Sequence, residues 1–258
     1  MQENNHATAA KLQATNYGAL STLITVFFFW GFIAAGNGVF IPFCKDYFHL
    51  DQFQSQLVDY AFYVAYYIGA LVIFMISSAT GKDLVGSWGY KKSIVYGLLF
   101  SAIGAIAMII AVNANTFSGM LVGLFIVALG FSLQQTAANP FAISLGDEST
   151  ATGRISLGGG INSFGTMIGP IIVSLLLFGT AAASEEQTKS LGLNNVSFMY
   201  AGVGALFIAA AALFNFSKKV PSGLNIEKQE PANKALNVLL VITGLLIFMF
   251  IPKSYHTL

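Results

Sequence analysis

The side chains best suited to chemistry lie at residues 129–141, where the sequence LGFSLQQTAANPF places three amides, two hydroxyls and a proline in an otherwise apolar segment. An unpaired polar group in lipid hydrocarbon costs on the order of several kcal/mol, so these groups must face protein or a water-filled cavity. Gln135 and Asn139 are four residues apart and share a helix face, and Pro140 loosens the backbone beside them. The stretch predicts a solute site with Gln134, Gln135 and Asn139 as substrate-binding residues.

Further candidates for the same site lie in three other apolar segments. Trp30 and Asn37 are seven residues apart on one helix face, and Asn162 follows a run of three glycines that permits close helix approach. An aromatic ring beside amides suits a sugar, whose hydroxyls need donors and acceptors and whose ring face is apolar. We therefore expect Trp30, Asn37, Tyr63 and Asn162 to bind substrate; for Trp30, a packed or lipid-facing position is the alternative.

Ion coupling needs a titratable group, and of the eleven acidic residues only Asp59 lies within an apolar segment. Tyr63 and Tyr66 follow it at i+4 and i+7 and extend the same face. Two interpretations stay open: Asp59 is the ion-coupling residue on the solute path, or it is a carboxylate at a helix start, where the helix dipole favours negative charge. The three histidines lie outside the apolar segments, which excludes a buried histidine relay.

Several other classes of function are disfavoured by the sequence. It has no cluster with metal-ligand spacing, no phosphate-binding Gly-Lys-Ser/Thr loop and no nucleophile–base pair, so we expect neither an enzyme nor ATP-driven transport, and no cofactor or metal. The single cysteine, Cys44, excludes an internal disulfide, and the net charge of +1 gives no indication of nucleic-acid binding.

The elements that position these residues are membrane helices. The chain is 55% hydrophobic and 9% charged, with a mean hydropathy of +0.71, whereas a soluble domain has about 25% charged residues. Apolar runs of about 20 residues are long enough to cross a bilayer. The sequence predicts an all-α multi-pass membrane protein with seven spans, at Tyr17–Phe43, Gln56–Ser78, Lys92–Val112, Phe117–Leu145, Ile155–Thr180, Val196–Phe216 and Ala235–Ile251.

The basic residues give these spans an orientation. If the N-terminus is cytoplasmic, nine lysine and arginine residues lie on the inner side and three on the outer side, as the positive-inside rule requires. We therefore expect residues 1–16 to be a cytoplasmic tail and 17–216 to be a six-helix unit. The linker 217–234, rich in charge, proline and glycine, then precedes a seventh helix and short tail at 235–258.

A weak internal sequence repeat relates the two halves of the six-helix unit. The first span contains Gly31-Phe32 and then Pro42-Phe43, and the fourth contains Gly130-Phe131 and then Pro140-Phe141, with an amide between the pairs each time. Three-plus-three inverted repeats of this kind build the halves of many secondary transporters. The recurring Gly-Phe and Pro-Phe pairs favour a three-plus-three inverted repeat.

Several runs of residues recur together in one known family. They are Trp30-Gly31 through Asn37 to Pro42, Phe53-Gln54 with Ala61-Phe62-Tyr63, Gln135 through Phe141, and Leu145-Gly146 with Arg154 and Asn162-Ser163-Phe164-Gly165. With these runs the chain resembles, over residues 18–216, the N-terminal half of the fucose/glucose-galactose:proton symporters of the major facilitator superfamily. The resemblance implies a bacterial inner-membrane carrier that binds a monosaccharide between two six-helix halves and works by alternating access.

The chain departs from that family at two titratable positions. Fucose symporters have an aspartate in place of Gly38 and a glutamate in place of Gln135, whereas glucose/galactose members have glutamine at the latter position. The usual membrane carboxylates are thus missing, which leaves Asp59 as the substitute. Whether the coupling ion is a proton, sodium or none stays open.

The second departure is length, because such a carrier needs about twelve helices. We expect the C-terminal six-helix half to be supplied in the same or another chain; the alternative is an inactive truncated remnant. A third alternative is an efflux antiporter for drugs or metabolites, favoured by Gly165-x-x-x-Gly169-Pro170.

Overall fold

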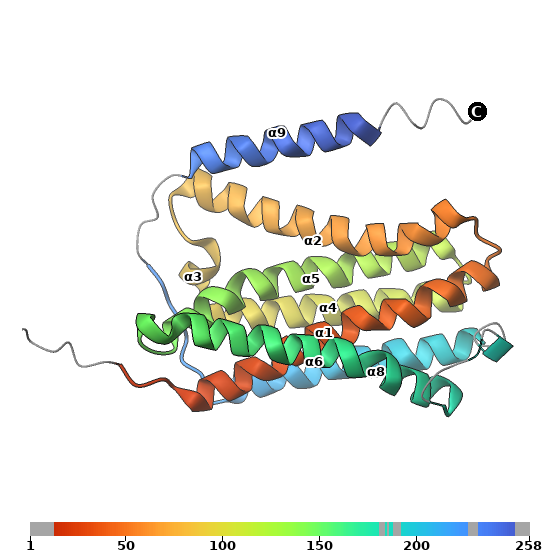
Figure 1. Ribbon diagram of the computed structural model, residues 1–258, viewed down its shortest axis with the longest axis horizontal. Coiled ribbons are helices and arrows are strands. Elements are labelled where there is room, and N and C mark those ends of the chain that lie inside the picture. The colour runs from red at the N-terminus through yellow and green to blue at the C-terminus, as the bar shows by residue number, and fades with distance from the viewer. Residues whose placement is uncertain (1–12, 181–183, 185, 188–191, 227–231, 251–258) are drawn as a thin grey trace, which may run out of the picture.

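The structure is a computed structural model that describes residues 13–180, 184, 186–187, 192–226 and 232–250. The regular elements in this part of the chain are helices arranged as a bundle (Figure 1). Their bounds are α1 Tyr17–Tyr47, α2 Gln52–Thr80, α3 Leu84–Trp88, α4 Tyr90–Asn113, α5 Phe117–Ser144, η1 Glu148–Thr150, α6 Ala151–Phe178, α8 Leu193–Phe216 and α9 Asn233–Phe250.

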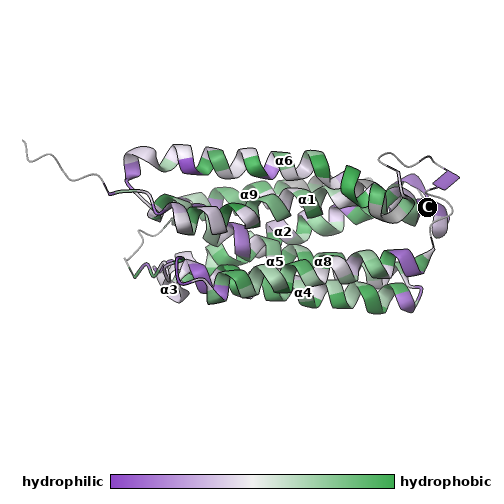
Figure 2. Cartoon of the chain, turned by 90° about the horizontal axis from the view of Figure 1, so that it is seen from below, coloured by the Kyte–Doolittle hydropathy of each residue, from purple (hydrophilic) through white to green (hydrophobic). Residues whose placement is uncertain are grey.

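Six of the described helices are long and apolar enough to cross a membrane, namely α1, α2, α4, α5, α6 with η1, and α8. They confirm the first six predicted spans and the all-α fold class. Figure 2 shows apolar residues along the helices and most hydrophilic residues at the two ends of the bundle. The predicted seventh span forms the helix α9 beside α2, but its described apolar part, Asn233–Leu245, is shorter than a span. Its membrane crossing stays a prediction.

Glycines set the close approach of the central helices. A Cβ on Gly31 of α1 would lie 1.9 Å from the backbone oxygen of Asn162 in α6, and one on Gly165 of α6 would lie 2.3 Å from the backbone oxygen of Phe28. Gly97 of α4 and Gly130 of α5 meet in the same way. These contacts hold α1 against α6 and α4 against α5, because only a residue without a side chain fits between the backbones.

A buried arginine ties the end of α5 to the start of α6. Arg154 donates to the backbone oxygens of Ala142 and Ile143, both at 2.7 Å, and to Thr150 Oγ1 at 2.6 Å. The guanidinium thereby satisfies carbonyls that a helix C-terminus leaves without intrahelical partners. In the adjoining turn, the hydroxyl and amide of Ser149 both donate to the Asp147 carboxylate, which lowers its pKa below the usual value.

The described part of the linker lies against the bundle. The backbone amides of Tyr90 and Lys91 donate to the oxygens of Gly223 and Ser222, and the amide of Asn225 donates to the oxygen of Gly86. These bonds attach residues 222–225 to the corner between α3 and α4. The division of the chain at 217–234 stays a prediction.

Candidate functional site

An open cavity of about 640 Å³ lies between α1, α2, α5 and α6. We call it the polar cavity. Its wall carries five side chains that the sequence singled out, Trp30, Asp59, Tyr63, Gln135 and Asn162, together with Tyr66. The structure therefore brings together, from four helices, residues that are up to 132 positions apart in the chain. A cavity of this size fits the range of about 300–1,000 Å³ typical of small-molecule sites.

The indole of Trp30 is held by a chain of buried hydrogen bonds. Its Nε1–H donates to Gln134 Oε1 at 2.8 Å, Gln134 Nε2 donates to Ser101 Oγ at 3.1 Å, and Ser101 Oγ donates to the Val127 backbone oxygen at 3.0 Å. Trp30 is 3% exposed and Gln134 is 0% exposed. Trp30 also packs on Phe27, with 4.7 Å between the ring centroids, so it occupies the packed position that was the alternative and contributes only a small part of its surface to the wall of the polar cavity.

Gln134 is placed differently from the expectation that it contacts substrate. It does not line the polar cavity, because both ends of its amide are bonded inside the bundle. Gln135, one residue on, points about 100° away around the helix and reaches the cavity instead. The hydrogen bonds of Gln134 orient the Trp30 ring. A contact between Gln134 and substrate stays a prediction.

The amide of Gln135 is oriented by a tyrosine on a neighbouring helix. The Tyr66 hydroxyl donates to Gln135 Oε1 at 2.6 Å. This leaves the Nε2 group, with its two N–H donors, for a solute; within the described residues it donates to no other group. Gln135 can therefore act as a hydrogen-bond donor to a hydroxyl oxygen.

The amide of Asn162 presents the opposite polarity. Its Nδ2 donates to the backbone oxygen of Phe27 at 3.0 Å, across the α1–α6 contact at Gly31. Oδ1 is then the free end of the amide in the polar cavity and can accept a hydrogen bond from a hydroxyl. Gln135 and Asn162 together supply a donor and an acceptor, which is the pair that a sugar hydroxyl needs.

Asp59 and Tyr63 form the wall contributed by α2. Both line the polar cavity, and Tyr63 is 61% exposed. Asp59 lies two turns inside the start of α2, because the helix begins at Gln52 and not at Gln56. In the described part of the chain Asp59 has no ion-pair partner, so its carboxylate is open to solute and solvent.

Two predicted residues are not part of the observed wall. Asn139 is exposed and does not line the polar cavity, and the side chain of Asn37 lies outside the described part of the chain. Thr166 and Pro170 line the cavity from α6; the sequence did not single out Thr166, and it singled out Pro170 only as part of the Gly165-x-x-x-Gly169-Pro170 pattern. Thr166 is four residues after Asn162, so the helical spacing could have found it.

The described residues hold no group of three or more histidine, cysteine, aspartate or glutamate side chains that could bind a metal ion.

Comparison with known proteins then decides the family. The Major Facilitator Superfamily model matches residues 19–255. The chain belongs to this superfamily. The resemblance to its fucose and glucose/galactose transporters is also confirmed, by the relatives described next.

The curated relatives of this superfamily member are sugar transporters. It is 33% identical over 230 residues to a glucose/galactose transporter of Brucella abortus, which covers 89% of this chain and 52% of the relative. It is 34% identical over 176 residues to the L-fucose-proton symporter of Escherichia coli, covering 68% of this chain and 38% of the relative. The chain thus spans about half the length of the glucose/galactose relative.

The fold agrees with a solved structure of the same superfamily. The transporter FucP in the outward conformation matches with a TM-score of 0.62 and 29% identity, over 78% of this chain and 50% of FucP. The described helices are therefore arranged as in about half of a major facilitator transporter.

Proposed function

We propose that this chain forms the sugar-binding half of a secondary transporter that carries a monosaccharide of the fucose, glucose and galactose class across the bacterial inner membrane. The observation that carries the proposal is the polar cavity with Trp30, Gln135 and Asn162 on its wall. An exposed aromatic ring, that of Tyr63, together with an amide donor and an amide acceptor matches the chemistry of a pyranose. The names of the relatives support the same substrate class.

Transport in this proposal works by alternating access. A second six-helix half, in the same or another chain, faces α1, α2, α5 and α6, and the two halves rock about the sugar. The positive-inside bias places the N-terminus in the cytoplasm. The polar cavity then extends from the middle of the bundle toward its outer end, because Asp59 lies two turns from the start of α2 whereas Trp30 lies near the middle of α1 and Gln135 in the second half of α5.

Counterflow into proteoliposomes tests the substrate class. Liposomes containing the chain together with the second six-helix half, preloaded with unlabelled D-glucose, D-galactose or L-fucose, are expected to accumulate the same labelled sugar faster than empty liposomes. Efflux of a drug-like cation without any sugar counterflow would support the antiporter alternative and contradict the proposal. If no solute moves in either assay although both halves are present, the proposal is contradicted and the remnant alternative is supported.

Ion coupling in this proposal rests on Asp59, which is the carboxylate among the described residues that line the polar cavity. In the Asp59→Asn variant, the pH dependence of sugar counterflow or uptake is expected to flatten, because an amide cannot gain or lose the proton. Asp46→Asn is the matched control, since Asp46 lies on α1 outside the cavity wall. A pH profile that is unchanged in Asp59→Asn would exclude Asp59 from coupling and leave a sodium-coupled or uncoupled carrier.

A further inference from the structure

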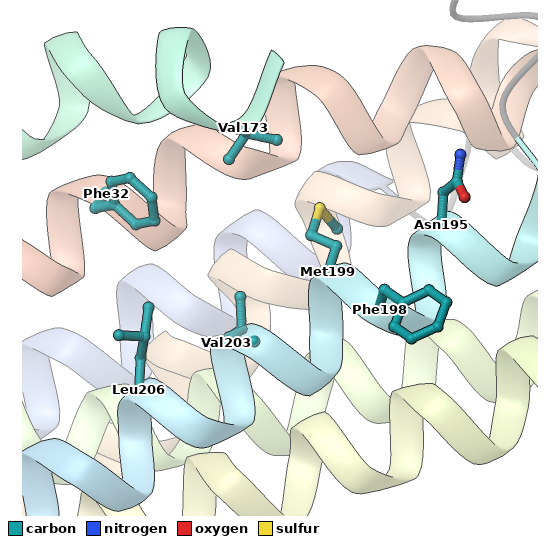
Figure 3. A pocket seen from close by; sticks show the side chains of 8 residues that line it. Phe32, Val173, Asn195, Phe198, Met199, Val203 and Leu206 are labelled. Carbon is teal, nitrogen blue, oxygen red and sulfur yellow. The ribbon is translucent and has the colours of Figure 1, made fainter. Parts of the chain in front are cut away.

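A second cavity, of about 550 Å³, lies between α8 and the pair α1 and α6. We call it the apolar cavity. Figure 3 shows Phe32 and Val173 on one side of it, and Met199, Val203 and Leu206 of α8 on the other. Among the described residues it shares no lining residue with the polar cavity, and a small cavity of about 30 Å³ that includes Phe32 and Phe62 borders both.

The apolar cavity lies where one of two equivalent helix pairs is not packed. In a three-plus-three repeat, α1 and α5 are the first helices, and α8 and α4 are the third helices of the opposite repeats. α5 packs extensively against α4, and a Cβ on Gly130 would lie 2.2 Å from Ser101 Oγ. The corresponding pair, α1 and α8, makes far less contact. The space between α4 and α5 is filled by their side chains, whereas the corresponding space between α1 and α8 is open.

The open space reaches the side of the bundle. Phe198, which lines the apolar cavity, is 77% exposed. Gly202 also lines it, and a Cβ built on Gly202 meets no atom within 4 Å. An occupant can therefore enter laterally, past α8, without displacing a described side chain.

The medium at this position is hydrocarbon, because α1, α6 and α8 are all candidate membrane spans. Water does not fill an apolar cavity, and an empty one loses dispersion contacts on all its walls. Among the described lining residues only Asn195 is polar, and it lies in the first turn of α8, at the helix end. Figure 3 places its amide at the end of the row of apolar α8 side chains. The lining thus has an apolar body and a single polar end.

We propose that the apolar cavity binds one acyl chain of a bilayer phospholipid, with the ester end beside Asn195. The chain is held between α8 and the pair α1 and α6, in place of the side-chain contacts that α4 and α5 make. The proposal does not rest on the proposed sugar site, because the described lining residues of the apolar cavity differ from those of the polar cavity.

Native mass spectrometry of the full chain, released from nanodiscs of palmitoyl-oleoyl phosphatidylglycerol, tests the proposal. The wild-type chain is expected to keep one phospholipid after the surrounding lipid is removed. In Gly202→Phe the fraction with this lipid is expected to fall about tenfold, because the ring occupies the space of several methylenes. Gly160→Phe is the matched control, since Gly160 is a helical glycine of α6 outside the cavity that also has no atom within 4 Å of an added Cβ.

Equal loss of the lipid in Gly202→Phe and Gly160→Phe, or a wild-type chain without bound phospholipid, would overturn the proposal. Circular dichroism verifies that both variants keep their helices. If Gly202→Phe does not fold, a phospholipid with a photoreactive acyl chain gives the answer in the wild-type protein. Crosslinks to Met199 and Val203 above those to the exposed residue Ile208 are expected, and an even distribution over α8 would contradict the assignment.

Discussion

Replacing Gln135 with alanine is expected to raise the dissociation constant of a bound monosaccharide by about 10- to 100-fold, because a sugar hydroxyl left without its partner costs about 1–3 kcal/mol. The Gln135 amide is held by Tyr66, so the donor is in place before the sugar arrives. Binding of the sugar then does not have to order the Gln135 side chain, so that entropic cost does not reduce the contribution of the hydrogen bond. Isothermal titration with D-glucose, D-galactose and L-fucose measures the change.

Thr136→Ala is the matched control for this variant. Thr136 is the next residue on α5, and its hydroxyl donates to the Ser132 backbone oxygen of its own helix at 2.8 Å. Its removal is expected to leave sugar affinity unchanged. If Gln135→Ala and Thr136→Ala weaken binding equally, the loss comes from a disturbed α5 and not from a lost contact in the polar cavity.

The second large effect is expected from Gly31→Ala. A Cβ on Gly31 would lie 1.9 Å from the Asn162 backbone oxygen, so α1 and α6 must move apart. Overpacking of this kind costs about 1–3 kcal/mol, and occasionally more. Because the Asn162 amide bonds α1 beside this contact, the variant should also weaken sugar binding. Unfolding of the purified chain in mixed micelles, followed by circular dichroism, measures the loss of stability.

Gly36→Ala serves as the control on the same helix. A Cβ on Gly36 meets no atom within 4 Å, and replacing a helical glycine with alanine stabilises a helix by about 0.5–1 kcal/mol. Gly31→Ala is therefore expected to lower the stability of the chain, and Gly36→Ala to raise it. A Gly31→Ala chain as stable as the wild type would show that α1 and α6 are not in this close contact.

The existence of the helices could be predicted because each span is an apolar run of about 20 residues. Their ends could not be predicted from hydropathy. α2 begins at Gln52 because the Asp51 carboxylate accepts from the Gln54 amide while the Gln54 side chain accepts from the Asp51 amide. This capping box lies outside the apolar run, so helices with polar ends extend beyond the predicted spans.

The types of residue at the site could also be predicted, but not their pairing. Helix spacing put Gln134 and Gln135 on different faces without showing which face meets the cavity. Only the arrangement of α1 and α5 shows that Gln134 bonds to Trp30, and only the approach of α2 shows that Tyr66 bonds to Gln135. Such contacts join residues 69 to 104 positions apart, and their geometry depends on the packing of whole helices.

Intrinsic fluorescence of Trp30 tests most directly the claim that the polar cavity binds a monosaccharide. The chain has two tryptophans, and Trp88→Phe leaves Trp30 on the cavity wall as the sole reporter. Titration with D-glucose, D-galactose and L-fucose is predicted to give a saturable change in emission with at least one of the sugars, weakened when Gln135→Ala is added. Emission that stays constant with all three sugars, in a chain that retains its helical circular dichroism, would contradict the claim.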